Sequence, residues 1–231
     1  RSGGYAIPGV EGSQTLRFLS GDRELGSKTV TVLVGKNVKQ DLALPYAEYS
    51  EQDLRERLLY VEASRGCPYK CEFCLSALDK TAWPFELERF MAELAGLFDR
   101  GARHFKFVDR TFNLRIGHAS GILQFFLDRM RGADGRMPES SEVFVHFELV
   151  PDKLPEQLKS LIAQFPAGSL QLEVGIQSLN PEVQQRISRR QDDARSFENL
   201  SWLLAHSQAH VHADLIFGLP GETLESFAAG F

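Results

Sequence analysis

Several features are absent from this sequence, and each absence excludes a class of protein. No run of about eighteen or more apolar residues occurs, so neither a transmembrane helix nor a membrane partner is expected. The formal net charge is −5 at pH 7, whereas nucleic-acid-binding domains are normally basic. The segment from Arg1 to Tyr5 contains neither an initiator methionine nor the apolar core of a signal peptide. A cytoplasmic globular protein without a nucleic-acid partner is therefore expected, as its 43% hydrophobic content also indicates.

Cysteine is scarce, and its distribution is the most informative feature of the chain. The only three cysteines, Cys67, Cys71 and Cys74, follow the spacing C-x3-C-x2-C. An odd number of cysteines leaves one thiol over in any disulfide framework, and unpaired thiols fit a reducing cytoplasm. Three thiolates on one loop can instead ligate three irons of a cubane iron–sulfur cluster, which is normally held by four cysteines. One iron would then lack a protein ligand, which suggests chemistry at that iron.

A zinc site is the main rival interpretation of this loop. Structural zinc takes four ligands, commonly pairs of Cys or His at short spacing. The nearest downstream histidine is His104, thirty residues after Cys74, and no second short-spaced ligand pair occurs. The iron–sulfur interpretation is therefore favoured, and a non-catalytic zinc-binding module is the alternative from another class.

The chain divides into two parts of different character. Residues 1–57 carry frequent Gly and Pro around two short candidate strands, Thr15–Leu19 and Thr29–Val34, with a Gly-Asp turn between them. This pattern predicts a linker with a small β-hairpin, the tail of a domain upstream of Arg1. Over 58–231, short apolar runs alternate with amphipathic stretches of helical period, which predicts the main domain.

The second part predicts an α/β fold. The expected strands are Leu58–Ser64, His104–Asp109, Val143–Leu149, Leu170–Gln177 and Val211–Phe217. The expected helices are Pro84–Arg100, Gly117–Arg131, Pro155–Gln164, Pro181–Ile187 and Ala194–His206. Prolines 84, 155 and 181 suit helix starts. Serial βα units imply a parallel sheet with functional residues at the carboxyl ends of its strands.

Polar residues mark those strand ends. They are Asp109, Glu148, Gln177, Asp214 and, in the segment after the fourth strand, Arg189 with Arg190 beside it. A single carboxylate on a strand is more often structural than functional. Several at the same end of successive strands, beside a cysteine loop, favour one shared site. The six histidines form no metal-binding pair, and His146 and His212 come nearest to the strand ends.

The loop Cys67-x3-Cys71-x-Phe73-Cys74 resembles the signature of radical S-adenosylmethionine (radical SAM) enzymes. The resemblance implies a partial (β/α)6 barrel with its cluster loop after the first strand, here truncated after the fifth βα unit. It also implies a [4Fe-4S] cluster whose fourth iron chelates the methionine moiety of SAM, which is cleaved reductively to a 5′-deoxyadenosyl radical. In this family the aromatic residue before the last cysteine, here Phe73, packs by the adenine.

Two further motifs are similar to oxygen-independent coproporphyrinogen oxidase. They are G-x-Q-S-x-N-x-E, followed after six intervening residues by Arg189, and D-L-I-x-G-L-P-G-x-T from Asp214. The similarity implies that Glu148 and Gln177 contact the SAM ribose region, that Arg189 pairs with the methionine carboxylate, and that Asp214 reaches the ribose hydroxyls. Carboxylates accept hydrogen bonds from hydroxyls, and arginine offers a fork to a carboxylate.

One family motif is replaced in this chain. Many radical SAM enzymes bind the SAM amino group with a Gly-Gly-Glu motif after the second strand, where this chain has Val108-Asp109-Arg110. Asp109 and Thr111 are the candidates for that role.

The segments around Ile7–Val10, Glu62–Pro68 and Phe105–Asn113 are similar to radical SAM proteins that carry a cobalamin-binding domain. This similarity implies a cobalamin-dependent methyl transfer or rearrangement of a small-molecule substrate, with cobalamin bound upstream of this chain. An external electron donor of the flavodoxin or ferredoxin type is implied as well. The alternative within the superfamily is a porphyrin-type decarboxylase or haem chaperone. At least one further βα unit is expected after Phe231.

Overall fold

The computed structural model describes residues 12–20, 23–32, 49–78 and 82–231. The chain divides into two compact units, Arg1–Asp53 and Leu54–Phe231. Among the helices in the described ranges, none has the length and hydropathy needed to cross a membrane.

The first unit contains the predicted β-hairpin. Strand β1 (Gly12–Ser20) pairs antiparallel with β2 (Arg23–Val32), and the Oγ1 atoms of Thr15 and Thr29 lie 3.1 Å apart across the pair. Both strands are longer than the sequence predicts. The Gly-Asp turn and the last two residues of the expected second strand lie outside the described residues.

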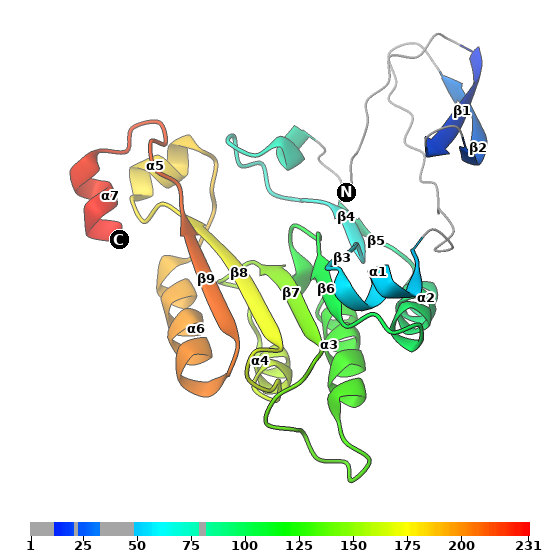
Figure 1. The fold of residues 1–231 in the computed structure, drawn as a ribbon. Helices are drawn as coiled ribbons and strands as arrows, with labels where there is room; N and C mark the ends of the chain where they lie inside the picture. Colours follow the sequence, from blue (N-terminus) through cyan, green and yellow to red (C-terminus); the bar gives the residue numbers. More distant parts are fainter. Residues whose placement is uncertain (1–11, 21–22, 33–48, 79–81) are drawn as a thin grey trace. The chain divides into compact units, whose positions relative to one another are not determined.

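The second unit is built around a five-stranded parallel sheet, as the sequence predicts (Figure 1). In spatial order its strands are β3 (Leu59–Val61), β6 (His104–Phe107), β7 (Phe144–Leu149), β8 (Leu170–Gln177) and β9 (His210–Leu215). Strand β8 has the predicted bounds, and the other four overlap their predictions. The prediction was wrong for the end of the first strand, because the chain leaves the sheet after Val61 and forms β4 (Ser64–Gly66).

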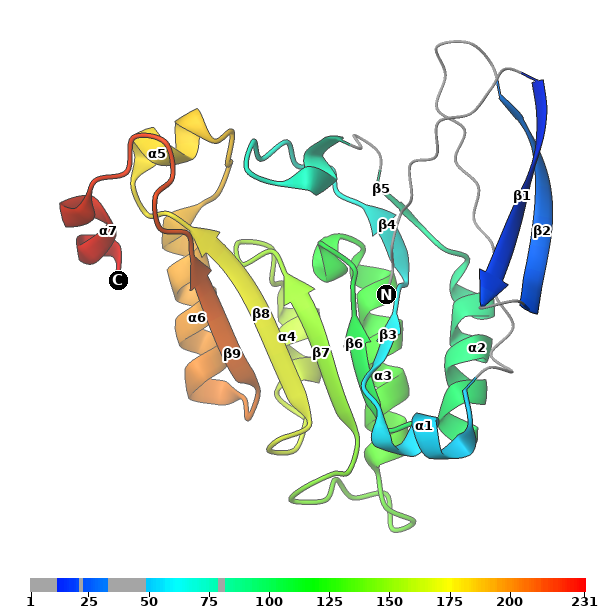
Figure 2. The same cartoon turned by 45° about the horizontal axis from the view of Figure 1, so that its top comes forward.

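Helices cover one face of the sheet (Figure 2). These are α2 (Leu87–Asp99), α3 (Ile116–Met130), α4 (Glu156–Ile162) and α6 (Asp193–His206). Helix α1 (Glu51–Glu56) leads into β3, whereas α5 (Pro181–Arg186) and α7 (Leu224–Gly230) follow the carboxyl ends of β8 and β9. The alternation of strands and helices gives the predicted α/β class.

The expected helix start at Pro84 is wrong. Pro84 belongs to β5 (Ala82–Pro84), which pairs antiparallel with β4. Helix α2 begins at Leu87, and the Glu86 side chain caps it by accepting hydrogen bonds from the backbone N–H groups of Glu88 and Arg89. A carboxylate satisfies amides at a helix N-terminus that would otherwise lack partners, so the helix starts at this cap.

The two faces of the sheet differ in chemistry because side chains alternate along each strand. Phe105, Phe107, Val145, Phe147 and Leu172 are at most 1% exposed and pack toward the helices. The opposite face, here called the open face, is polar, and no described helix of this unit covers it (Figure 2). Its residues include Tyr60, Lys106, His146, Glu148, Gln171, Glu173, His212 and Asp214. The open face leads up to the strand ends, where the candidate site lies.

Candidate functional site

The cysteine loop is carried by a short hairpin. The chain leaves through β4 and returns through β5, so the β4–β5 ladder forms the base of the loop. Gly66 has φ +87°, a conformation that favours glycine, and it turns the chain directly before Cys67. The amide of Cys74 donates to the Cys71 carbonyl at 3.0 Å, and a 3-10 helix, Leu75–Leu78, follows. The loop geometry therefore places all three cysteines in one tight turn region.

The three cysteine thiols differ in their burial. Cys71 is buried, and Cys67 and Cys74 are partly exposed. Burial raises the pKa of the Cys67 thiol, and the neighbouring Cys71 and Cys74 add to the rise, whereas a backbone hydrogen bond with Tyr69 and the Arg189 charge oppose it. In the described residues no group of three or more His, Cys, Asp or Glu side chains is placed to hold one metal ion. Three thiols from one loop fit a cubane cluster, whose thiolates each bind a separate iron.

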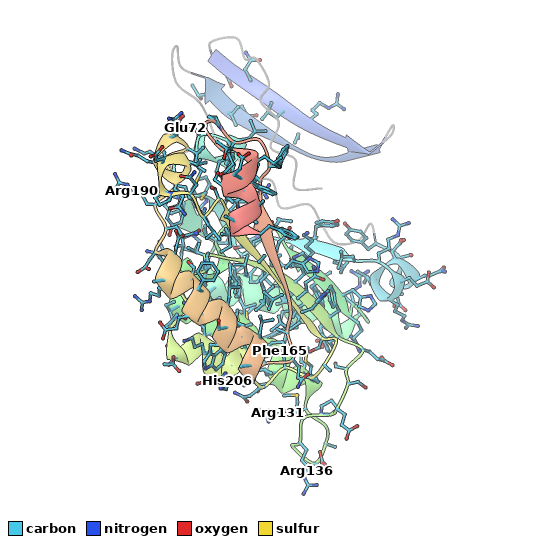
Figure 3. The ribbon with its side chains drawn as sticks, turned by 90° about the vertical axis from the view of Figure 1, so that its left-hand side faces the viewer. Glu72, Arg131, Arg136, Phe165, Arg190 and His206 are labelled. Carbon is cyan, nitrogen blue, oxygen red and sulfur yellow. The ribbon has the colours of Figure 1, made fainter. Side chains whose placement is uncertain are left out.

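The segment that follows α5 forms hydrogen bonds with the cysteine loop. The amide of Glu72 donates to the Ile187 carbonyl at 3.0 Å, and Ser188 Oγ lies 3.0 Å from Glu72 Oε1. Ser188 has φ +54°, an uncommon conformation for a residue other than glycine. Figure 3 shows Glu72 beside this segment. The sequence does not predict these hydrogen bonds of Glu72 with Ile187 and Ser188, because no local pattern signals them.

Arg189 faces the loop, and Arg190 does not. Arg189 Nη1 lies 3.8 Å from Cys71 Sγ, and Nη2 donates to the Gly175 carbonyl at 2.6 Å. Arg190 is exposed and points away from the fold (Figure 3). The structure thus brings Arg189 to the cysteines.

The end of β8 has an irregular backbone. Gln177 has φ +74°, and its register with β9 shifts between Gly175 and Gln177. A Cβ atom on Gly175 would lie 2.2 Å from Gln177 Nε2, so the Gln177 amide folds back over the strand into space that only a glycine leaves. Asp214 is the β9 partner of Gly175 in the register, and it is exposed. Gln177, Asp214 and Arg189 therefore gather around Gly175.

Glu148 lies on the open face beside these residues. Its Oε1 atom is 3.4 Å from Arg110 Nη1. Burial raises the pKa of Glu148, and the nearby Glu173 adds to that rise, while Arg110 and Lys106 lower it. Phe73, on the cysteine loop, has an exposed ring, 38% accessible.

Asp109 is separate from this group. It is 1% exposed, and its carboxylate accepts hydrogen bonds from the Ala63 amide at 2.9 Å and from Ser64 Oγ at 2.5 Å. Burial raises its pKa to about 6, against the lowering effect of these hydrogen bonds. Thr111 is also buried, 7% exposed. Asp109 thus supports the start of β4 at Ser64, which lies three residues before Cys67.

A parallel α/β sheet with a three-cysteine loop at the carboxyl end of its first strand defines a class of iron–sulfur domain. The radical SAM superfamily model matches residues 61–229. The chain belongs to the radical SAM superfamily.

Individual relatives refine this result. The chain is 29% identical over 189 residues to the cobalamin-dependent radical SAM methyltransferase TokK of Streptomyces tokunonensis, covering 78% of this chain and 26% of TokK. It is 36% identical over 62 residues to the oxygen-independent coproporphyrinogen III oxidase of Thermostichus vulcanus, covering 27% of this chain and 19% of the oxidase. Among solved structures, the fold resembles the radical SAM methyltransferase TsrM of Kitasatospora setae, with a TM-score of 0.62 at 23% identity over 78% of this chain and 34% of TsrM. The chain thus spans about a quarter of TokK and a third of TsrM.

Proposed function

We propose that this chain is the cluster- and SAM-binding domain of a cobalamin-dependent radical SAM methyltransferase. The observation that carries the proposal is the match to TokK over 78% of the chain, together with the three-cysteine loop at the strand ends. In this proposal residues 58–231 form the catalytic core, and residues 1–57 connect it to a cobalamin-binding domain.

The chain's own residues supply the binding groups. Cys67, Cys71 and Cys74 would hold three irons of a [4Fe-4S] cluster. When bound, this cluster supplies the electron for the reductive cleavage of SAM, and it is recharged by an external donor of the flavodoxin or ferredoxin type. Arg189, whose Nη1 faces Cys71, would bind the carboxylate of the methionine moiety through its planar fork.

The remaining contacts would orient the nucleoside part of SAM. The Gln177 amide and the Asp214 carboxylate lie at neighbouring strand ends and would bind the ribose hydroxyls, with Glu148 beside them. The exposed ring of Phe73 would pack by the adenine. For Asp109 we propose an indirect role, in which its carboxylate holds the start of the cysteine loop through Ala63 and Ser64.

The porphyrin-type alternative has less support. The similarity to the coproporphyrinogen oxidase covers 27% of this chain, whereas the similarity to the methyltransferase TokK covers 78%. An upstream cobalamin domain would separate the two functions, because the porphyrin-type proposal does not need one.

Anaerobic reconstitution of the full-length protein tests the proposal. We expect one [4Fe-4S] cluster per chain, a reduced EPR signal that changes when SAM is added, and a corrin absorbance that co-elutes with the iron. Replacing any one of the three cysteines by alanine should abolish the iron while leaving the corrin absorbance in place. A colourless protein with one zinc would support the zinc module instead. A cluster without bound cobalamin would favour the porphyrin-type enzyme.

A further inference from the structure

A second polar centre lies on the open face of the sheet, apart from the cysteine loop. It is formed by Lys106 on β6, His146 on β7 and Glu173 on β8. Lys106 Nζ and His146 Nε2 both approach the same carboxylate oxygen, Glu173 Oε2, at 3.4 Å and 2.9 Å. This Lys106–His146–Glu173 centre belongs to none of the roles assigned above.

His146 is unusual within the centre because its ring nitrogen is buried without a hydrogen bond. The residue is 5% exposed, and Nε2 has no hydrogen-bond partner in the described residues, although it lies near Glu173. The distance between His146 Nε2 and Glu173 Oε2 would allow a hydrogen bond, but the ring N–H does not point at this oxygen. Burial lowers the pKa of His146, and the Lys106 charge lowers it further, whereas the nearby Glu173 carboxylate opposes the lowering. A buried polar atom without a partner is costly, and a bound polar group would remove that cost.

The ion pairing around the centre is also loose. Lys106 and Glu173 are partly exposed, and their separation of 3.4 Å exceeds the roughly 2.7–2.9 Å of a good charge-assisted hydrogen bond. The next pair toward the cysteine loop, Arg110 with Glu148, has the same separation. Each cation is matched by one carboxylate, so this part of the open face carries no net charge. Such a surface favours a ligand that carries both charges. A simple anion that paired with one of the cations would leave a carboxylate unpaired, and a simple cation would leave a lysine or arginine unpaired.

We propose that the Lys106–His146–Glu173 centre binds the ammonium and carboxylate groups of an amino-acid substrate. The ligand's ammonium group takes the place of Lys106 at the Glu173 carboxylate. Its carboxylate binds Lys106, and His146 donates to it in the tautomer that carries the proton on Nε2. One long internal ion pair is thus exchanged for two pairs with the ligand. The inference rests on the proposed methyltransferase function and names the class of its substrate.

Ligand-observed NMR on the full-length protein tests this binding directly. The probes are the twenty proteinogenic L-amino acids, measured one at a time, followed by the N-acetyl and methyl-ester derivatives of any that bind. We expect at least one amino acid to bind saturably and each single-charge derivative to bind at least about tenfold more weakly. Glu173→Gln and Lys106→Met should each weaken binding of the amino acid by at least about tenfold. Glu156→Gln, which changes an exposed carboxylate on α4, is the matched control and should leave binding unchanged.

Several results would overturn the assignment. One is that no amino acid binds. Another is that the derivatives bind as well as the parent, or that Glu173→Gln and Lys106→Met bind it as wild type does. Loss of binding in Arg189→Ala with none in Glu173→Gln would place the ligand in the methionine site of SAM. Because binding is read without turnover, iron and corrin content of the same samples decide the proposed function separately.

Discussion

Replacing Arg189 by alanine is expected to weaken SAM binding without loss of the iron–sulfur cluster. The guanidinium donates through Nη2 to the Gly175 carbonyl at 2.6 Å and to Gln191 Oε1 at 3.1 Å, while Nη1 lies 3.8 Å from Cys71 Sγ. One edge of the fork is therefore fixed to the end of β8, and the other faces the cysteine loop. Loss of one charge-assisted hydrogen bond costs roughly 1.5–3 kcal/mol, which is a roughly 10- to 150-fold rise in the Kd for SAM.

Equilibrium dialysis with labelled SAM, on anaerobically reconstituted full-length protein, measures this Kd, and iron analysis of the same samples confirms the cluster. Arg190→Ala is the matched control, because Arg190 is the next residue and is exposed. Arg189→Lys keeps the charge without the fork, so an intermediate Kd is expected. An Arg189→Ala protein with full iron content and the wild-type Kd would refute the reasoning. A loss confined to Arg190→Ala would move the assignment by one residue.

Two further predictions follow from Asp109 and from Gly175. The folded-state pKa of Asp109, about 6, lies above its ordinary value, so its contribution to the free energy of unfolding is present below about pH 4 and lost as pH rises through 6. The loss amounts to about 3 kcal/mol, and Asp109→Asn should abolish it. Urea unfolding of both proteins between about pH 4 and about pH 7 measures the free energy of unfolding. If the difference between the two proteins does not change with pH, the Asp109 carboxyl is not the cause. Gly175→Ala should displace the Gln177 amide, so it should raise the Kd for SAM about as much as Gln177→Ala does, and the double variant should show no additional rise. Additive effects in equilibrium dialysis would contradict this coupling.

Much of the fold is predictable because strand alternation and helical period are local signals. Strand β8 matches its prediction because every second residue along it is buried, and Asn180 caps the helix that follows. The start of α2 was not predictable in this way. Pro84 pairs with Ser64 across the whole cysteine loop, and that contact depends on how the loop closes.

The site shows the same division between local and non-local causes. The cysteine spacing is a local signal, and the three residues do lie on one loop. Arg189, and not Arg190, reaches Cys71, and it directly follows Ser188, whose positive φ the sequence does not reveal. Asp109 was expected to face a ligand, but β6 ends two residues earlier, and the turn that follows directs its carboxylate to Ala63 and Ser64.

The contact between Glu72 and the Ile187–Ser188 segment couples two distant parts of the site. It joins the loop that follows the first strand of the sheet to the segment that follows the fourth, although β3 and β8 are not neighbours in the sheet. The chain therefore forms a continuous bridge across the strand ends, above the open face. Arg189 follows Ser188 directly, so the same segment that holds the cysteine loop also carries the guanidinium that faces Cys71. Ser188→Pro, which cannot adopt the positive φ of Ser188, would therefore loosen the cysteine loop and displace Arg189 together.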